Sequence, residues 1–124
     1  MRFIRTMLTL SLVLNIVVLV PVCAGLLMQA DWIQASYGEA NPARGILLSV
    51  YLSILVASAL LLALRDPGPV ATLLLVQIVY KLTTPFTVGT FHNPVVISNL
   101  GIAAFHAVTL IVIWQRIGNP FRGT

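Results

Sequence analysis

Charged residues are scarce in this sequence. They make up 8% of its 124 residues, with only three acids among them, whereas hydrophobic residues make up 59%. A water-soluble globular domain uses about 25% charged residues, so the composition excludes that class of protein. We therefore expect an integral membrane protein.

Groups that catalyse reactions or bind metals are also few. The single cysteine, Cys23, excludes an intrachain disulfide and a thiolate metal cluster. His92 falls in a loop and His106 in an apolar run, so the chain alone does not supply two axial ligands for a haem inside a bundle. The apolar runs hold no pair of carboxylates and no glycine-rich phosphate loop. The sequence therefore predicts no cofactor and no metal, and it favours a non-catalytic protein.

Four apolar runs are long enough to cross a hydrocarbon core of about 30 Å. They cover approximately residues 7–28, 45–64, 70–89 and 95–114, with a polar outer loop at 29–44. The first run resembles a secretory signal, but it exceeds the usual apolar length of about 7–15 residues, so we expect a retained helix. The pattern predicts an all-α fold in which residues 1–124 form a single transmembrane domain, an integral membrane four-helix bundle.

The formal net charge of +4 is unevenly distributed along the chain. One side of the predicted bundle collects Arg2, Arg5, Arg65, Arg116 and Arg122, and the other side has Arg44 alone. Cytoplasmic loops carry the excess of basic residues, so we expect both termini in the cytoplasm and a multi-pass protein of the cell inner (cytoplasmic) membrane. Topology and contact with anionic lipid explain this charge. We therefore expect the lipid bilayer as a partner and no nucleic acid.

Small and polar residues within the runs indicate how the helices pack. Helices in lipid associate through close contact of small residues and through hydrogen bonds. Such residues recur at every fourth position of the second run, and we assign them to helix packing: Gly45, Ser49, Ser53 and Ala57. In the first run, Ser11 and Asn15 are also four residues apart, and we expect Asn15 to pair with a neighbouring helix.

Lys81 is the only lysine and lies inside the third run. A charge at mid-membrane costs about 2.5–3.5 kcal/mol on insertion scales and marks a functional hypothesis. If the helix ends near Thr84, the ammonium can extend to the outer surface. If it continues to Gly89, the charge lies deep and must find a partner or lose its proton. Helical spacing puts Gln77, Tyr80 and Lys81 on one side of this run.

Two polar residues of the fourth run, Asn99 and His106, share a helical face because they are seven residues apart. We expect His106 to be hydrogen-bonded to Asn15, Ser53 or Tyr80, and a proton relay or a quinone contact is the alternative. The predicted ligand-binding set is Lys81, Tyr80, Gln77, His106 and Asn99.

A resemblance supports the same fold. Tyr37-Gly38 precedes the second run, Arg44 and the segment GILLSVY (45–51) open it, and Lys81 lies in the third run. This arrangement is similar to the DoxX-like and DUF4345-like small four-helix membrane proteins. The resemblance implies a four-helix membrane fold. DoxX relatives have been linked to quinone-coupled oxidation of sulfur compounds, but no residues of this chain can be assigned to such a site.

Three functions are compatible with these features. The first is a non-catalytic accessory or interaction subunit of a membrane complex, which associates with other membrane protein subunits or with itself through the small-residue stripe. The second is a binder or carrier of a small anionic or lipophilic molecule, quinone- or lipid-like, with Lys81 as its counter-charge. It predicts a cavity bounded by the third and fourth runs. The third is a homo-oligomeric channel or transporter.

Overall fold

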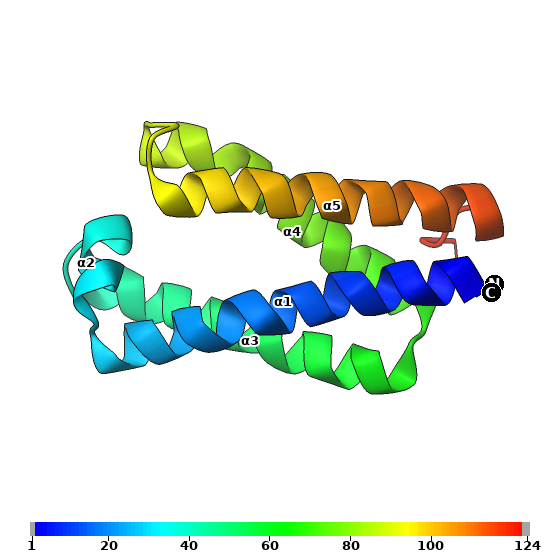
Figure 1. Ribbon diagram of the computed structural model, residues 1–124, viewed down its shortest axis with the longest axis horizontal. Helices are drawn as coiled ribbons and strands as arrows, with labels where there is room; N and C mark the ends of the chain where they lie inside the picture. Colours follow the sequence, from blue (N-terminus) through cyan, green and yellow to red (C-terminus); the bar gives the residue numbers. More distant parts are fainter. Residues whose placement is uncertain (1, 123–124) are drawn as a thin grey trace.

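The computed structural model describes residues 2–122, which form five helices and no β-strand (Figure 1). The helices are α1 (Arg2–Met28), α2 (Asp31–Tyr37), α3 (Pro42–Leu64), α4 (Pro67–Val88) and α5 (Pro94–Ile117). All except α2 are long and apolar enough to cross a membrane. The all-α prediction is confirmed, and α2 lies within the predicted polar loop.

The same dipeptide pattern starts three of the long helices. An asparagine or aspartate is the N-cap and a proline follows it at Asn41-Pro42, Asp66-Pro67 and Asn93-Pro94. Each capping side chain accepts a hydrogen bond from a backbone N–H of the first turn, which would otherwise lack a partner. Proline suits this turn because its fixed φ is helical and its missing N–H costs nothing there. The sequence therefore sets where α3, α4 and α5 begin.

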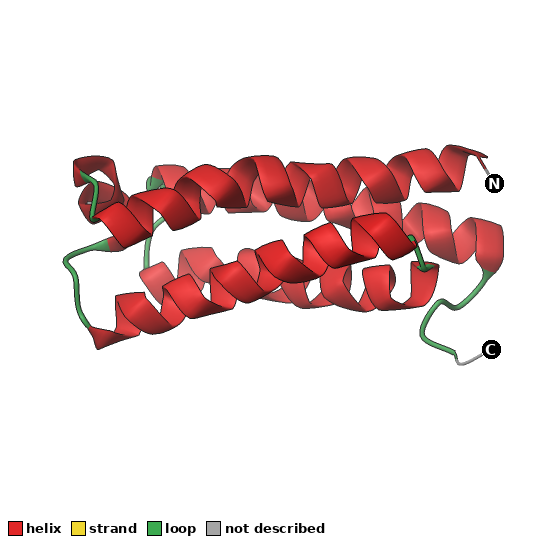
Figure 2. Ribbon diagram, turned by 90° about the horizontal axis from the view of Figure 1, so that it is seen from below, coloured by secondary structure: helices red, strands yellow, loops and turns green. Residues whose placement is uncertain are grey.

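The four long helices lie side by side as an antiparallel bundle (Figure 2). Helix α1 packs closely against α3 and also against α5, and α4 packs closely against α5. Helices α3 and α4 are also neighbours, but they contact one another less than these three pairs do. Residues 2 and 117 lie at the same end of the bundle, together with the α3–α4 turn, and α2 lies at the opposite end (Figure 1).

Two apolar clusters fill the interior. The cluster near the chain ends joins α1, α4 and α5 through Ile4, Leu8, Leu12, Val70, Leu74 and Ile113. The cluster near α2 joins α1, α2 and α3 through Leu19, Cys23, Leu26, Ile33, Tyr51 and Ile54. Along α1, the polar residue Asn15 lies between the two clusters, so the middle of the bundle is held by hydrogen bonds as well as by apolar contact.

Helix α2 rests on the end of α1 because residue 25 is a glycine. A Cβ atom at Gly25 would lie 2.5 Å from the Trp32 ring and 2.8 Å from the Ile33 side chain. No real side chain fits at that distance. This close approach buries Ile33 completely and leaves Trp32 half exposed beside it. Helix α2 thereby closes one end of the bundle.

The predicted helix-packing stripe of α3 does not pack within the chain. Gly45, Ser49 and Ser53 are exposed, and Ala57 is half-buried. Helix α3 instead buries a different face, with residues spaced by seven, namely Arg44, Tyr51 and Ser58, together with Ile54. The reason is polar: Ser58 finds a hydrogen-bonding partner on α1, whereas the Ser53 hydroxyl is already bonded to the carbonyl of Ser49. Contact of this stripe with another chain stays a prediction.

Candidate functional site

Polar side chains follow the buried face of α5. Asn99, His106 and Thr109 are all less than 10% exposed, and spacings of seven and three residues place them on one face. Helix α5 contacts both α1 and α4, so this face can hydrogen-bond to two helices. These residues are the frame on which the site is built.

Asn15 joins three helices in the middle of the bundle. Its Nδ2 donates to Ser58 Oγ at 3.0 Å, and its Oδ1 lies 2.8 Å from His106 Nε2. Since an amide oxygen can only accept, Nε2 of His106 is the donor and Nδ1 of the neutral ring carries a lone pair. This Nδ1 is buried and has no partner among the described residues. The predicted pairing of Asn15 with a neighbouring helix is confirmed, and Asn15 is the partner of His106 among the three expected.

A second link lies closer to the chain ends. The hydroxyls of Ser11 and Thr109 are 2.7 Å apart, and the Thr109 hydroxyl donates to the carbonyl of Phe105 at 3.2 Å. Because that bond uses the only proton of Thr109, Ser11 is the donor between the two hydroxyls. This pair ties α1 to α5 and leaves no donor over.

Lys81 lies on the opposite side of this frame, on α4. Helix α4 continues past Pro85 to Val88, so the ammonium lies inside the bundle, and the side chain is 4% exposed. Its Nζ donates to Asn99 Oδ1 at 3.4 Å and lies 4.9 Å from the centre of the Tyr80 ring. A cation over an aromatic face is attracted to it. The ammonium therefore points inward, toward neutral partners, and does not extend to the end of the bundle that carries α2.

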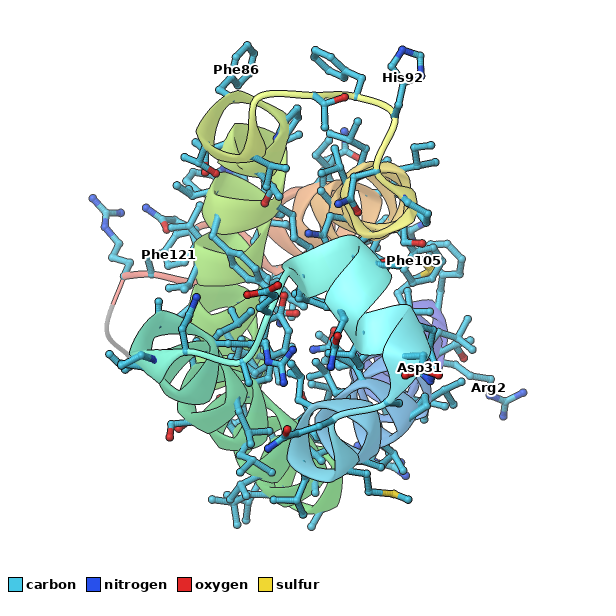
Figure 3. All side chains as sticks on the ribbon, turned by 90° about the vertical axis from the view of Figure 1, so that its left-hand side faces the viewer. Arg2, Asp31, Phe86, His92, Phe105 and Phe121 are labelled. Carbon is cyan, nitrogen blue, oxygen red and sulfur yellow. The ribbon has the colours of Figure 1, made fainter. Side chains whose placement is uncertain are left out.

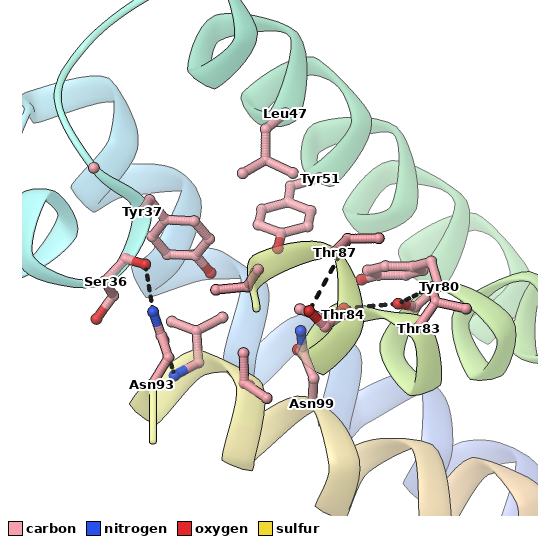
Figure 4. Close-up of a pocket in the computed structure, with 14 residues that line it drawn as sticks. Ser36, Tyr37, Leu47, Tyr51, Tyr80, Thr83, Thr84, Thr87, Asn93 and Asn99 are labelled. Atoms are coloured by element: carbon pink, nitrogen blue, oxygen red, sulfur yellow. Dashed lines mark hydrogen bonds between the residues drawn. The ribbon is translucent and has the colours of Figure 1, made fainter. Parts of the chain in front are cut away.

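A cavity of about 670 Å³ opens beside this group, between α4 and α5 on one side and α2 and α3 on the other (Figure 4). Fourteen residues line it: Ser36, Tyr37, Gly38, Leu47, Tyr51, Tyr80, Thr83, Thr84, Thr87, Val88, Asn93, Val95, Val96 and Asn99. The volume lies within the range of small-molecule sites, about 300–1,000 Å³. The predicted cavity between the third and fourth runs is therefore present.

Some hydrogen-bonding groups of this cavity already have partners, and others do not. The hydroxyls of Thr83 and Thr84 both donate to the carbonyl of Tyr80, and the hydroxyl of Thr87 donates to that of Thr84 (Figure 4). Their protons are thus used within α4. In contrast, the buried hydroxyl of Tyr80 has no partner among the described residues. The Oδ1 atom of Asn99 accepts from Lys81, and its amide nitrogen points toward Thr84 (Figure 4).

Two further tyrosines and an asparagine shape the α2 end of the cavity. The rings of Tyr37 and Tyr51 pack edge to face, with centroids 6.1 Å apart. Burial raises the pKa of Tyr37 well above its usual value, so its phenol stays protonated. Asn93 Nδ2 donates to the Ser36 carbonyl at 2.8 Å, which fixes α2 over the start of α5. The cavity is thus closed at this end by hydrogen bonding and aromatic contact.

The predicted site residues are only partly brought together. Tyr80 and Asn99 line the cavity, and Lys81 lies one hydrogen bond behind Asn99. Gln77 is buried deeper, with its amide turned to its own helix at Leu73, and His106 belongs to the Asn15 link. Sequence reasoning missed Tyr51, although its spacing of seven residues from both Arg44 and Ser58 marks it as part of the buried face of α3.

His92 points away from the bundle at the α4–α5 loop (Figure 3). It is exposed, whereas His106 is completely buried. Across residues 2–122, no three side chains of the His, Cys, Asp and Glu types gather closely enough to hold a metal ion.

No family model, curated protein or solved structure matches this chain. The resemblance to DoxX-like proteins stays a prediction, and the case for function rests on the cavity and its neighbours.

Proposed function

We propose that this chain is a multi-pass protein of the cell inner membrane that binds a small amphipathic molecule with an anionic head. The molecule lies in the cavity of about 670 Å³ that is lined by α2, α3, α4 and α5, called the α2–α5 cavity below. The head lies at Asn99 and Tyr80, with the Lys81 ammonium behind them. The apolar part of the molecule contacts Leu47, Val95 and the other aliphatic residues of the lining. This role is the binder or carrier foreseen from the sequence.

The basic residues support the membrane orientation in this proposal. Arg2, Arg5 and Arg65 line one recess at the end of the bundle that carries both chain ends. At the opposite end, Arg44 is buried, and its Nη1 donates to the Gly38 carbonyl at 2.7 Å. The free positive charge therefore gathers at one end, which the positive-inside rule assigns to the cytoplasm. The cavity then lies near the outer face of the membrane.

The observation that carries the proposal is the burial of Lys81 without a carboxylate. The acids of the chain are Asp31, Glu39 and Asp66, and all three are exposed, at the first residue of α2, in the α2–α3 loop and at the N-cap of α4. The hydrogen bond of Lys81 goes to a neutral amide instead. A buried charge is costly until an opposite charge or several hydrogen bonds compensate it. An anionic head in the adjacent cavity supplies that compensation.

The donors of the cavity also select an acceptor. The Tyr80 hydroxyl has a proton to give, and the amide nitrogen of Asn99 points into the space beside Thr84. Because Oδ1 of Asn99 already accepts from Lys81, a ligand that binds this side chain meets its N–H side. A carboxylate can accept from both groups at once, whereas an alcohol satisfies them less well.

Hexanoic acid is a suitable probe because it is small enough for the cavity. We expect it to bind the protein in lipid nanodiscs, measured by equilibrium dialysis against empty nanodiscs, and to bind more tightly than hexan-1-ol. Asn99→Leu and Tyr80→Phe each remove one donor, and a hydrogen bond to a charged group contributes about 1.5–3 kcal/mol, so each should weaken binding about tenfold or more. Gln77→Leu is the control, because Gln77 is buried on α4, the helix that also carries Tyr80, but does not line the cavity. Equal binding by all four proteins would refute the proposal.

A second function is favoured by a different observation. The stripe of Gly45, Ser49 and Ser53 faces outward on α3, and a Cβ atom added at Gly45 would meet nothing within 4 Å. Such small-residue stripes let a second helix approach closely in lipid, which suits an accessory subunit that associates with another membrane protein or with a second copy. Co-purification from mild detergent tests this function. We expect Ser49→Leu to weaken the association, and a protein that stays strictly monomeric without any partner would contradict it.

A further inference from the structure

A groove of about 530 Å³ runs along the outside of the bundle between α3 and α4. These two helices contact one another only sparsely, because α4 runs obliquely and separates from α3 toward the α2 end (Figure 1). The groove is mostly apolar, and its lining comprises Leu47, Val50, Tyr51, Ser53, Ile54, Ala57, Leu73, Val76 and Tyr80. Its outer edges are open, since Val50 is 48% and Val76 is 57% exposed.

The groove and the α2–α5 cavity share part of their walls. Leu47, Tyr51 and Tyr80 line both of them. Tyr80 therefore lies where the cavity and the groove meet, with its hydroxyl buried. On the α3 side, Ser53 and Ala57 keep the groove deep because their side chains are small. Two members of the predicted helix-packing stripe thus border a space within this chain.

We infer that the ligand is a single-chain amphiphile, such as a fatty acid, whose alkyl chain lies in the α3–α4 groove while its carboxylate lies at Asn99 and Tyr80. This inference rests on the proposed function and specifies the class of its ligand. The ligand enters sideways from the membrane, since the groove opens toward the lipid-facing side of α3 and α4. The adjacency of the two spaces, which have three wall residues in common, favours this occupant. A flexible alkyl chain can follow them past Tyr51 and Tyr80, whereas a partner helix, about 10 Å wide, can cover the groove but cannot continue into the cavity.

Photolabelling tests where the alkyl chain of the ligand lies. The probe is hexadecanoic acid with a diazirine at mid-chain, incorporated into lipid nanodiscs that hold the full chain, and labelled residues are mapped by mass spectrometry. We expect labelling on groove residues of α3 and α4, reduced by excess unlabelled hexadecanoic acid. Ala57→Leu should lower this labelling about fivefold or more, because three added carbons occupy the place of the alkyl chain. Ala59→Leu is the matched control, since Ala59 is exposed on the same helix outside the groove.

A second pair of variants guards against misfolding of the first. Ser53→Leu fills the groove from an exposed position, and Ser49→Leu adds the same side chain outside it. Labelling that spreads evenly over the lipid-facing residues of all four long helices would overturn the inference, and so would equal labelling of the filled and control variants. If either result is found but hexanoic acid still binds in an Asn99-dependent way, the proposed function stands and only the inferred position of the alkyl chain is wrong. Loss of Asn99-dependent binding would refute the proposed function itself.

Discussion

Replacement of Asn15 by leucine tests whether hydrogen bonds hold the middle of the bundle. Asn15 bonds to Ser58 on α3 and to His106 on α5, and leucine has nearly the same size but makes neither bond. Hydrogen bonds between membrane helices contribute about 0.6 kcal/mol each on average, with a maximum of about 1.7 kcal/mol. His106 is 0% exposed, so its orphaned Nε2–H adds a penalty of about 1–3 kcal/mol. We therefore expect Asn15→Leu to lower the free energy of unfolding by about 2–4 kcal/mol.

The measurement is unfolding by sodium dodecyl sulfate in mixed micelles, followed by circular dichroism. The double variant Asn15→Leu/His106→Leu separates the hydrogen bond from general packing. Because both partners are then absent, its cost should be smaller than the sum of the two single costs by about 1 kcal/mol. Ser53→Ala is the control: its hydroxyl is exposed and bonded within its own helix, so a change below about 0.5 kcal/mol is expected. Strictly additive costs, or an Asn15 variant as stable as the Ser53 variant, would refute this account.

Two further predictions concern the end of the bundle that carries α2. Gly25→Ala should displace α2, because the new Cβ would lie 2.5 Å from the ring of Trp32, and overpacking of this kind costs about 1–3 kcal/mol. The displacement should change the fluorescence emission of Trp32, measured in a Trp114→Phe background. An unchanged spectrum would contradict the close approach. Arg44→Ala removes the 2.7 Å hydrogen bond to the Gly38 carbonyl and should increase proteolysis of the 38–41 loop. Arg44→Lys should restore resistance to proteolysis only in part, because an ammonium lacks the planar fork of the guanidinium. If the alanine variant were as resistant as the wild type, this role of Arg44 would be excluded.

The type of each element and the position where it begins follow from residues that are neighbours in the sequence. The dipeptides Asn41-Pro42, Asp66-Pro67 and Asn93-Pro94 each combine a capping side chain with a proline at the first turn, and apolar runs follow them. Element type and approximate bounds depend on such neighbours along the chain. The all-α fold could therefore be predicted before any contact between helices was known.

The rotation of each helix about its axis was less accessible. On α3, both the small stripe of Gly45 and Ser49 and the face of Tyr51 and Ser58 have helical spacing, so periodicity alone does not decide which one is buried. The choice depends on Asn15, which lies 43 residues away from Ser58 along the chain and accommodates its hydroxyl. Small residues lose little when they face outward. A rule based on size therefore selected the exposed face.

The inward direction of Lys81 has a similar explanation. Spacing placed it beside Tyr80, but its burial depends on Asn99, whose Oδ1 accepts from the ammonium across the α4–α5 contact. The extension of α4 beyond Pro85 to Val88 also lengthens the path from the ammonium to the α2 end of the bundle. The acceptor on α5 is not visible within the third run itself, whereas the longer helix is one of the two alternatives that this run allowed. The cavity beside the third and fourth runs could be predicted, but the part of its lining that comes from α2 and α3 could not, because it depends on contacts between distant segments.

The balance of donors and acceptors separates the structural part of this interior from the part that can bind a ligand. Ser11 donates to Thr109, and Asn15 bonds to both Ser58 and His106. Among these groups, the buried side-chain atom without a partner is Nδ1 of His106, which is an acceptor. Toward the cavity the balance reverses: an ammonium, an amide and a phenol together supply six protons, and a single hydrogen bond of 3.4 Å joins them. Buried donors in excess need acceptors. The side of the bundle with that need is also the side with about 670 Å³ of space beside it, which is why the binding of an anion is the function that this interior supports best.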